Sequence, residues 1–334
     1  VNQKQGFDCP GCGWPDPDGD RAITEFCENG VKAVAHEATS RVITHEFFQH
    51  YSIEKLGKQS DYWLGQQGRL SRPMIKRNQD THYHPISWTK AFETIAGHLN
   101  ALDSPNSAIF YTSGRTSNEA AFLYQLFARL YGTNNLPDSS NMCHESSSVA
   151  LKEVIGIGKA TVTLDDFDKT DAIFILGQNP GTNHPRMLAT LQQAARRGCQ
   201  IVSINPLPEA GTTRFIHPQE VTRWLGRGTP IATLFLPVKI NGDVPLLKGI
   251  MKELLMREAK QPGSILDLPF IQQYTEGFDN FATVLLNMSW EKIEEGSGIA
   301  REDIQKAADI AVQAKSIICT WAMGMTQHKN AVAN

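Results

Sequence analysis

The stretch Asp171-Ala172-Ile173-Phe174-Ile175-Leu176-Gly177 decides the fold of this chain. It is an unbroken apolar run of strand length, and a polar loop over residues 178–184 follows it directly. A strand that is apolar on both of its faces is typical of a parallel sheet that helices cover on both sides. The stretch therefore predicts an α/β fold, with ligands bound at the loops that leave the strands.

The same alternation of strands and helices extends in both directions from this run. We expect helices over residues 87–102, 116–131, 185–198, 244–259 and 300–314. We expect further strands over residues 107–112, 200–205, 233–240 and 316–321. Thr116 and Glu119 have the spacing of a capping box at the start of one helix, and Pro185 suits the first turn of another.

The loops that follow these elements share a polar composition. They are rich in Gly, Asn, Ser and Thr, and they cover residues 113–116, 178–184, 205–207, 241–243 and 323–326. Backbone amides and small polar side chains of this kind bind phosphates and purine edges. The pattern therefore indicates a site for a large anionic cofactor.

Three cysteines lie near the start of the chain. Cys9-Pro10-Gly11-Cys12 places two thiols on one turn, so that both sulfurs can reach one metal centre, and Cys27 follows. Residues 1–40 are too rich in turns to form a core unaided, so a metal would stabilise them. The spacing leaves two alternatives open: an iron–sulfur cluster, or structural zinc with His36 as the fourth ligand.

Other cysteines and glycines carry weaker signals. Cys143 is followed by His144 in a polar stretch, where it is either an activated thiolate or an ordinary loop thiol. Cys199 and Cys319 lie in or beside apolar runs, which predicts small buried side chains. Gly156-x-Gly158 lacks the third glycine of a dinucleotide fingerprint, so it predicts a plain loop.

The composition excludes several classes of protein. Six cysteines in 334 residues are too sparse for a secreted disulfide framework, and a net charge of −3 gives no bias toward nucleic acid or a membrane. No apolar run reaches the roughly 18 residues that a membrane helix needs, and no signal peptide is visible, so we expect a cytoplasmic protein. The chain begins at Val1 and stops soon after residue 326, so we expect a fragment of a longer protein.

Taken in order along the chain, a set of motifs resembles one family. They are Cys9-Pro10-Gly11-Cys12, Ser113-Gly114-Arg115-Thr116-Ser117-Asn118-Glu119, Cys143-His144-Glu145, Gly177-Gln178-Asn179, Asn183-His184-Pro185, Asn241-Gly242-Asp243 and Met323-Gly324-Met325-Thr326-Gln327-His328. Over nearly its whole length the chain resembles the molybdopterin oxidoreductase superfamily. Within that superfamily it looks like the formate-dehydrogenase-related alpha subunits, in a branch linked to acid resistance.

The resemblance implies a fold like that of formate dehydrogenase and DMSO reductase. A small iron–sulfur domain would cover residues 1–65. One α/β domain would combine residues 66–140 with 320–334, and a second α/β domain, which binds molybdopterin guanine dinucleotide, would cover residues 141–319. The family's C-terminal β-barrel domain would lie outside this chain.

The resemblance also implies roles for individual residues. Molybdenum bis(molybdopterin guanine dinucleotide), abbreviated Mo-bis-MGD, would be bound by residues from both α/β domains. The residues that would line one pterin nucleotide are Gly177, Asn179, Asn183 and His184. Those that would hold its guanosine end are Asn205, Gly242 and Asp243. The dithiolene side would be approached by Gly324, Met325 and Thr326, and the matching loop of the other domain would be Ser113, Gly114 and Arg115.

The chemistry implied by the resemblance is a two-electron oxidation or reduction of a small formate-like or oxyanion substrate. Cys143 and His144 would act at the metal, with His144 as the proton handler, since its ordinary pKa lies in the useful range. A [4Fe–4S] cluster at Cys9, Cys12 and Cys27 would pass the electrons to a redox partner protein. Neither nucleic acid nor a membrane is an expected partner.

The chain departs from the family pattern at two places that bear on this chemistry. No cysteine occupies the third cluster position after Cys12, and Asn29 stands where the family has a lysine between cluster and pterin. Cys143 precedes Val149 by six residues, whereas the family's metal-binding residue precedes its valine by five, which is the place of His144 here.

These departures keep a second hypothesis open. A catalytically inactive relative, with structural zinc or a partial cluster, would act as a structural or partner-binding protein in acid resistance. A plain dinucleotide-binding dehydrogenase is disfavoured, because no complete Gly-x-Gly-x-x-Gly follows a strand.

Overall fold

The computed structural model describes residues 12–15, 27–113, 116–137, 142–220 and 225–334. The chain forms two compact units, and we describe each by itself. Unit 1 consists of Val1–Gly11 and Glu28–Ser139, and unit 2 consists of Cys12–Cys27 and Ser140–Asn334. The division into three domains stays a prediction.

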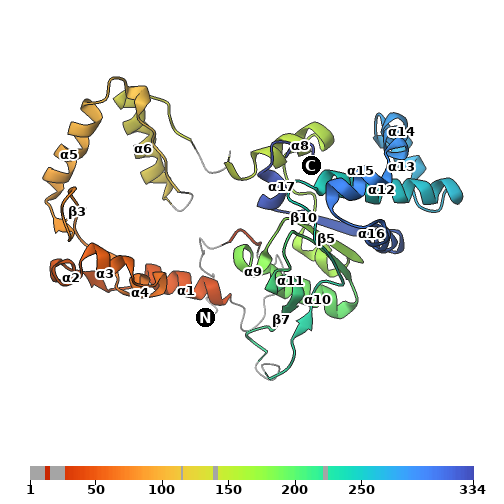
Figure 1. Ribbon diagram of the computed structural model, residues 1–334, viewed down its shortest axis with the longest axis horizontal. Coiled ribbons are helices and arrows are strands. Elements are labelled where there is room, and N and C mark those ends of the chain that lie inside the picture. Colours follow the sequence, from red (N-terminus) through yellow and green to blue (C-terminus); the bar gives the residue numbers. More distant parts are fainter. Residues whose placement is uncertain (1–11, 16–26, 114–115, 138–141, 221–224) are drawn as a thin grey trace. The chain divides into compact units, whose positions relative to one another are not determined.

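Unit 1 is built mostly of helices, with two small pairs of strands (Figure 1). Its helices are α1 (Glu28–Glu37), α2 (His45–His50), α3 (Ile53–Gly57), α4 (Asp61–Gln66), α5 (Trp88–Asn100), the 3₁₀ helix η1 (Pro105–Ser107) and α6 (Asn118–Tyr131). Its strands are β1 (Val42–Ile43), which pairs in parallel with β2 (Arg69–Leu70), and β3 (Met74–Ile75), which pairs antiparallel with β4 (His84–Pro85).

The two long helices of unit 1 are close to their predicted ranges. The Ser87 side chain caps α5 by accepting the Lys90 N–H at 3.1 Å. The cap of α6 differs from the prediction, because Ser117 rather than Thr116 accepts the Ala120 N–H. Thr116 instead lies 2.5 Å from the Thr112 hydroxyl, so its side chain is not available to the helix.

The prediction of a strand over residues 107–112 is wrong, because these residues pair with no other strand in the described part of the chain. The first residue of this range belongs to η1. The Phe110 N–H donates to the Asn135 carbonyl, but one isolated bond is not a ladder. An apolar run becomes a strand only where a neighbouring strand supplies hydrogen bonds to its backbone.

Unit 2 contains a parallel four-stranded sheet in the order β10-β5-β6-β9. The strands are β10 (Ile317–Trp321), β5 (Ala172–Leu176), β6 (Gln200–Ile204) and β9 (Leu234–Leu236). This confirms the parallel α/β fold, and all five residues of β5 are buried as an all-apolar strand requires. The last strand is shorter than the predicted 233–240.

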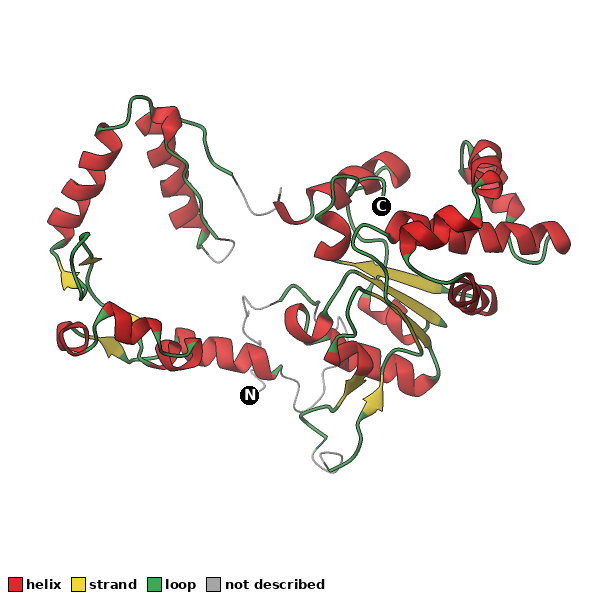
Figure 2. Cartoon of the chain, viewed as in Figure 1, coloured by secondary structure: helices red, strands yellow, loops and turns green. Residues whose placement is uncertain are grey.

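Helices cover both faces of this sheet, as Figure 2 shows for the yellow strands between red helices. One face carries Phe174 and Val202 and packs against α12, α15 and α16, through side chains such as Leu246, Ile293 and Ile304. The other face packs mainly against α10. The sheet is therefore the middle of three layers.

The helices and minor strands of unit 2 complete these layers. They are α8 (Glu145–Ile155), η2 (Leu164–Asp168), α9 (Pro180–Asn183), α10 (Met187–Arg197), α11 (Ala210–Thr213), β7 (Arg214–Phe215), β8 (Thr229–Pro230), α12 (Asp243–Lys260), α13 (Leu268–Tyr274), α14 (Phe278–Asn287), α15 (Trp290–Ser297), α16 (Arg301–Gln313) and α17 (Met323–Thr326). The Gly156-x-Gly158 segment follows the end of α8 as a loop, which agrees with the prediction.

Two further expectations are tested by burial. Cys199 is buried beside β6, as predicted, and burial raises the pKa of its thiol to about 11. Cys319 is exposed, and the prediction of a buried side chain is wrong. The reason is its position on β10, which is the outermost strand on one side of the described sheet. In the described parts of the chain, no helix has the length and apolar character to span a bilayer.

Candidate cofactor-binding site

The loops after β5 and β10 meet at two glycines. The Gly324 N–H donates to the Gly177 carbonyl at 2.9 Å. A Cβ on Gly177 would lie 2.6 Å from the Gly324 Cα, and Gly177 has a φ of +56°. A side chain is therefore excluded at both positions, and the two loops form one backbone surface beyond the carboxyl ends of neighbouring strands.

Gln178 lies buried beside this surface. Its side-chain nitrogen lies 3.3 Å from the His184 Nδ1 and 3.3 Å from the Met187 sulfur. The Asn205 side chain from the end of β6 donates to the Gln178 backbone carbonyl at 3.4 Å. The Gln178 Oε1 is buried without a hydrogen-bond partner among the described residues. A buried acceptor left without a donor is costly, which marks a place where a ligand donor would be favourable.

Asn179, Asn183 and His184 are held by the short helix α9. The Asn179 side chain caps this helix by accepting the Thr182 N–H at 3.3 Å, and Asn183 is exposed at its end. Burial lowers the pKa of His184, and the positive charge of nearby His144 lowers it further. His184 is therefore mostly neutral at pH 7.

Cys143 and His144 lie directly before α8 and are close to the loop after β10. The Cys143 thiol lies 3.4 Å from the Met323 sulfur. Nδ1 of His144 lies 3.2 Å from the Ser147 hydroxyl, and the electrostatic effect of His144 on His184 links this segment to the loop after β5.

Three hydrogen bonds hold residues 142–147, at the start of α8, against residues 321–327. The Trp321 indole donates to the Ser147 hydroxyl at 2.8 Å. The Ser146 hydroxyl donates to the Thr326 carbonyl at 3.4 Å, and the Gln327 side chain donates to the Met142 carbonyl at 2.6 Å. The structure thus brings Cys143, His144, His184 and Gly324 to one edge of the sheet, although they are far apart in sequence.

Asp243 forms a second, more enclosed part of this region. It is the first residue of the 18-residue helix α12, and it is 4% exposed. Its Oδ2 lies 3.9 Å from the His328 Nε2. Burial raises the pKa of the Asp243 carboxyl, and the charge of His328 opposes this. Gly242 precedes it in a tight turn, where a Cβ would lie 2.9 Å from the carbonyl oxygens of Gly296 and Lys239.

The predicted loop over residues 113–115 is not part of unit 2. Ser113 belongs to unit 1, and Gly114 and Arg115 lie outside the described residues. The Met325 side chain is buried in the core of unit 2, and its approach to the dithiolene side stays a prediction.

Only part of the predicted metal site at the start of the chain lies within the described residues. Cys12 and Cys27 are free, half-buried thiols, and Cys9 lies outside the described residues. Over the ranges that are described, no three His, Cys, Asp or Glu side chains gather as metal ligands. His36 lies on α1, with its Nε2 3.4 Å from the Gln66 side-chain nitrogen.

Three residues of the region were not predicted as site residues. Gln178 and Met323 lie in polar loops that the sequence did single out, so their position after a strand was the available signal. His328 lies beyond α17, and nothing in its local sequence indicates that it faces Asp243.

Comparison with known proteins identifies the family. Residues 69–333 match the family Molybdopterin oxidoreductase, and the chain belongs to this family. Membership implies a molybdenum–pterin cofactor, which agrees with the resemblance noted in the sequence.

The chain is similar to several longer proteins. It is 51% identical over its whole length to an uncharacterized oxidoreductase of Mycobacterium tuberculosis, of which it covers 43%. It is 46% identical to protein YdeP of Escherichia coli, covering 44% of that protein. Formate dehydrogenase H of Escherichia coli is 29% identical over 78% of the chain and 34% of that enzyme. The chain therefore spans less than half the length of these relatives.

A solved structure shares the fold. Acetylene hydratase from Pelobacter acetylenicus superposes on 92% of this chain, and on 36% of its own length, with a TM-score of 0.59 and 17% identity. At this level of identity, the similarity shows the fold alone.

Proposed function

We propose that this chain is part of a molybdopterin-dependent oxidoreductase that resembles formate dehydrogenase and binds Mo-bis-MGD. The observation that carries the proposal is the convergence of the loops after β5 and β10 at Gly177 and Gly324, in a chain that matches the family over residues 69–333. Formate dehydrogenase H as a relative supports the substrate class, a formate-like acid or an oxyanion.

The residues present fit a pterin nucleotide on two counts. The unpartnered Gln178 Oε1 is a buried acceptor, and pterin rings carry N–H donors. The close packing of Gly177 on Gly324, which any Cβ would prevent, joins the loops after β5 and β10 beyond the carboxyl ends of their strands, where ligands of α/β sheets bind.

The enclosed carboxylate fits the other end of the nucleotide. Asp243 is buried at the start of α12, where its carboxylate lies 3.9 Å from the His328 imidazole. A guanine base offers two adjacent N–H groups, which suit one carboxylate. We infer that Asp243 binds the guanosine end, together with Asn205 and Gly242.

The cofactor, when bound, would supply two-electron redox chemistry at molybdenum. The protein's own part is to hold it and to manage protons. We infer that the Cys143 sulfur would be a ligand of the metal and that His144 would exchange protons beside it. Because the Gln178 amide nitrogen donates to Nδ1 of the largely neutral His184, the ring proton lies on Nε2, which is therefore the atom that can donate toward a ligand.

We further propose that electrons leave through an iron–sulfur cluster at Cys9, Cys12 and Cys27, toward a redox partner protein. Cys-x-x-Cys spacing and the similarity to formate dehydrogenase H support this relay. The missing third cysteine implies that the cluster has a ligand of another kind.

Elemental analysis of the protein, purified without air, tests the proposal. We expect near-stoichiometric molybdenum or tungsten and about four irons per chain, and oxidation of formate by the same preparation with a dye as acceptor. Cys12→Ser should remove iron, whereas the control Cys319→Ser, on the exposed edge strand, should leave it unchanged. Zinc without molybdenum or iron would refute the proposal and favour a structural, partner-binding protein.

A further inference from the structure

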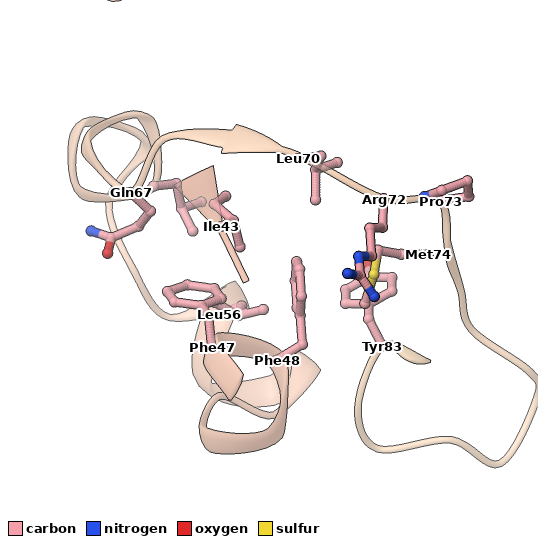
Figure 3. Close-up of a pocket in the computed structure, with 11 residues that line it drawn as sticks. Ile43, Phe47, Phe48, Leu56, Gln67, Leu70, Arg72, Pro73, Met74 and Tyr83 are labelled. Carbon is pink, nitrogen blue, oxygen red and sulfur yellow. The ribbon is translucent and has the colours of Figure 1, made fainter. Parts of the chain in front are cut away.

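A cavity of about 490 Å³ lies within unit 1, between the helices α2, α3 and α4 and the strands β1, β2 and β3. Figure 3 shows the side chains that line it. Almost all of them are apolar, and the cavity has the size of pockets that enclose small organic molecules. None of its residues belongs to the region proposed to bind molybdopterin.

One wall of the cavity is a cluster of packed aromatic rings. Phe47 and Phe48 of α2 lie with ring centroids 5.3 Å apart in an edge-to-face arrangement. Phe48 packs edge-to-face on Tyr83 at 5.6 Å, and Phe47 packs on Tyr51 at 4.8 Å and on Trp63 at 6.2 Å. Rings that fix one another in this way form a rigid apolar wall, which loses little conformational entropy when an aromatic ligand packs on it.

The rest of the wall is aliphatic and partly open to solvent. It includes Ile43, Leu56, Met74 and Leu70. The Leu70 side chain is 62% exposed, although its neighbours in the wall are at least half-buried. A ligand that covers this exposed apolar side chain removes apolar surface from water, which contributes favourably to the free energy of binding.

Arg72 is the one charged residue of the lining. Figure 3 shows its guanidinium beside Met74 and Tyr83 on the cavity side. Within the described ranges, no side chain forms a hydrogen bond or ion pair with it. Arg72 has a small electrostatic effect on the Glu46 carboxylate. The pKa of Glu46 is lowered chiefly by the Thr44 hydroxyl and least by Arg72.

The second polar residue of the lining offers no competing charge. The Gln67 amide nitrogen donates to the Trp63 carbonyl at 2.8 Å, which fixes the side chain. The cavity therefore combines a rigid aromatic wall, aliphatic side chains and one guanidinium that no described side chain pairs. Arginine binds carboxylates with two parallel hydrogen bonds, whereas an uncharged apolar ligand would leave it unpaired.

We propose that this cavity is a binding site for a small aromatic carboxylate. The ring would lie between Phe48 and Leu70, and its carboxylate would pair with Arg72. The site would be separate from the molybdopterin region in its ligand and in its residues, so it stands whether or not the proposed function holds.

Isothermal titration calorimetry on the whole protein tests this site, with 2-naphthoate as the probe and 2-naphthalenemethanol as its uncharged counterpart. Wild type should bind the acid at least about 10-fold more tightly than the alcohol, because only the acid forms charge-assisted hydrogen bonds. Arg72→Leu should weaken the binding of the acid by about the same factor and leave the affinity for the alcohol unchanged. The control Arg77→Leu removes a nearby arginine that does not line the cavity, and it should change neither.

Two filling variants distinguish this cavity from other apolar surface. Leu56→Trp and, independently, Met74→Trp should abolish binding of both compounds while the circular dichroism spectrum stays that of wild type. The proposal is overturned if wild type binds no naphthoate, if Arg72→Leu binds it as tightly as wild type, or if a folded filling variant still binds it.

Discussion

Replacing Gly324 by alanine tests whether the two loops of the cofactor region touch as described. The new Cβ would lie 2.4 Å from the Gly177 Cα and 2.8 Å from its carbonyl oxygen. Real Cβ atoms do not approach backbone this closely, so α17 or the loop after β5 must move. Gly324 does not have a positive φ, so the substitution tests the contact without adding backbone strain.

The size of the effect follows from this geometry. Overpacking costs about 1–3 kcal/mol, and backbone atoms on both sides of the contact place this case at the upper end of that range. Moving the loops also stretches the hydrogen bond between Gly324 and Gly177, which contributes about 1 kcal/mol. We expect a loss of about 3 kcal/mol, or a fall in Tm of about 6–12 °C for a unit of this size.

Thermal denaturation followed by circular dichroism measures this loss, with two matched controls. Gly181→Ala lies in the same region, but its Cβ would meet nothing closer than 3.4 Å, so it should change Tm little. Gly198→Ala has a φ of +96° and open space around it, so it should cost only the roughly 1 kcal/mol of backbone strain. A Tm for Gly324→Ala within about 2 °C of wild type would show that the loops do not touch as described.

The other predictions concern buried charges. Lys252→Met should destabilise unit 2 by about 2 kcal/mol, because the buried ammonium donates to the carbonyls of Leu286 and Met288; Lys248→Met on the same helix is the control in the denaturation assay. Glu258→Gln should lower Tm more at pH 7 than near pH 3, because backbone N–H groups, that of Gly263 foremost, hold the pKa of Glu258 below its ordinary 4.5. The stabilisation is then complete above that value and is lost as pH falls through the folded-state pKa; equal losses at both pH values would contradict this. Asp243→Asn should raise the Tm of cofactor-free protein at pH 8, because burial raises the pKa of Asp243 above 3.8 and the charged form costs stability as pH rises past that value. The same variant should retain less molybdenum. A lower Tm of the cofactor-free variant would refute the explanation that burying the charged Asp243 carboxylate costs stability.

The sequence predicts the sheet of unit 2 well because its strands are locally unmistakable. β5 is apolar throughout, and glycine or proline follows β5 and β6 within two residues, so composition alone marks them. α16 begins and ends within one residue of its predicted range.

The errors in prediction come from information that lies outside the local sequence. Residues 107–112 have the composition of a strand, but the described chain offers no neighbour to pair with them. Cys319 has an apolar setting in the sequence, yet its exposure depends on the order of the strands, which no local pattern encodes. The helix α9 was expected as part of a loop, because four residues are too few to show a helical period.

The candidate site was predictable in its position but not in its contacts. Loops after parallel strands gather at one edge of a sheet, which places residues near Gly177 and Gly324 together. The meeting of Cys143 with Met323, and of Asp243 with His328, depends on how segments pack across the unit. No spacing in the sequence carries that information.

The attachment of the start of α8 to the end of β10 has a consequence for the order of folding. The hydrogen bonds that hold Ser147 and Met142 come from residues 174 and 185 positions later in the chain. During synthesis, the segment around Cys143 therefore emerges long before the residues that position it exist. Closing contacts over such long loops is slow, because the entropy of the loop is lost before the contacts form. The thiol of Cys143 thus reaches its native surroundings among the last steps of the assembly of unit 2, after the neighbouring strands β5 and β6 have been made.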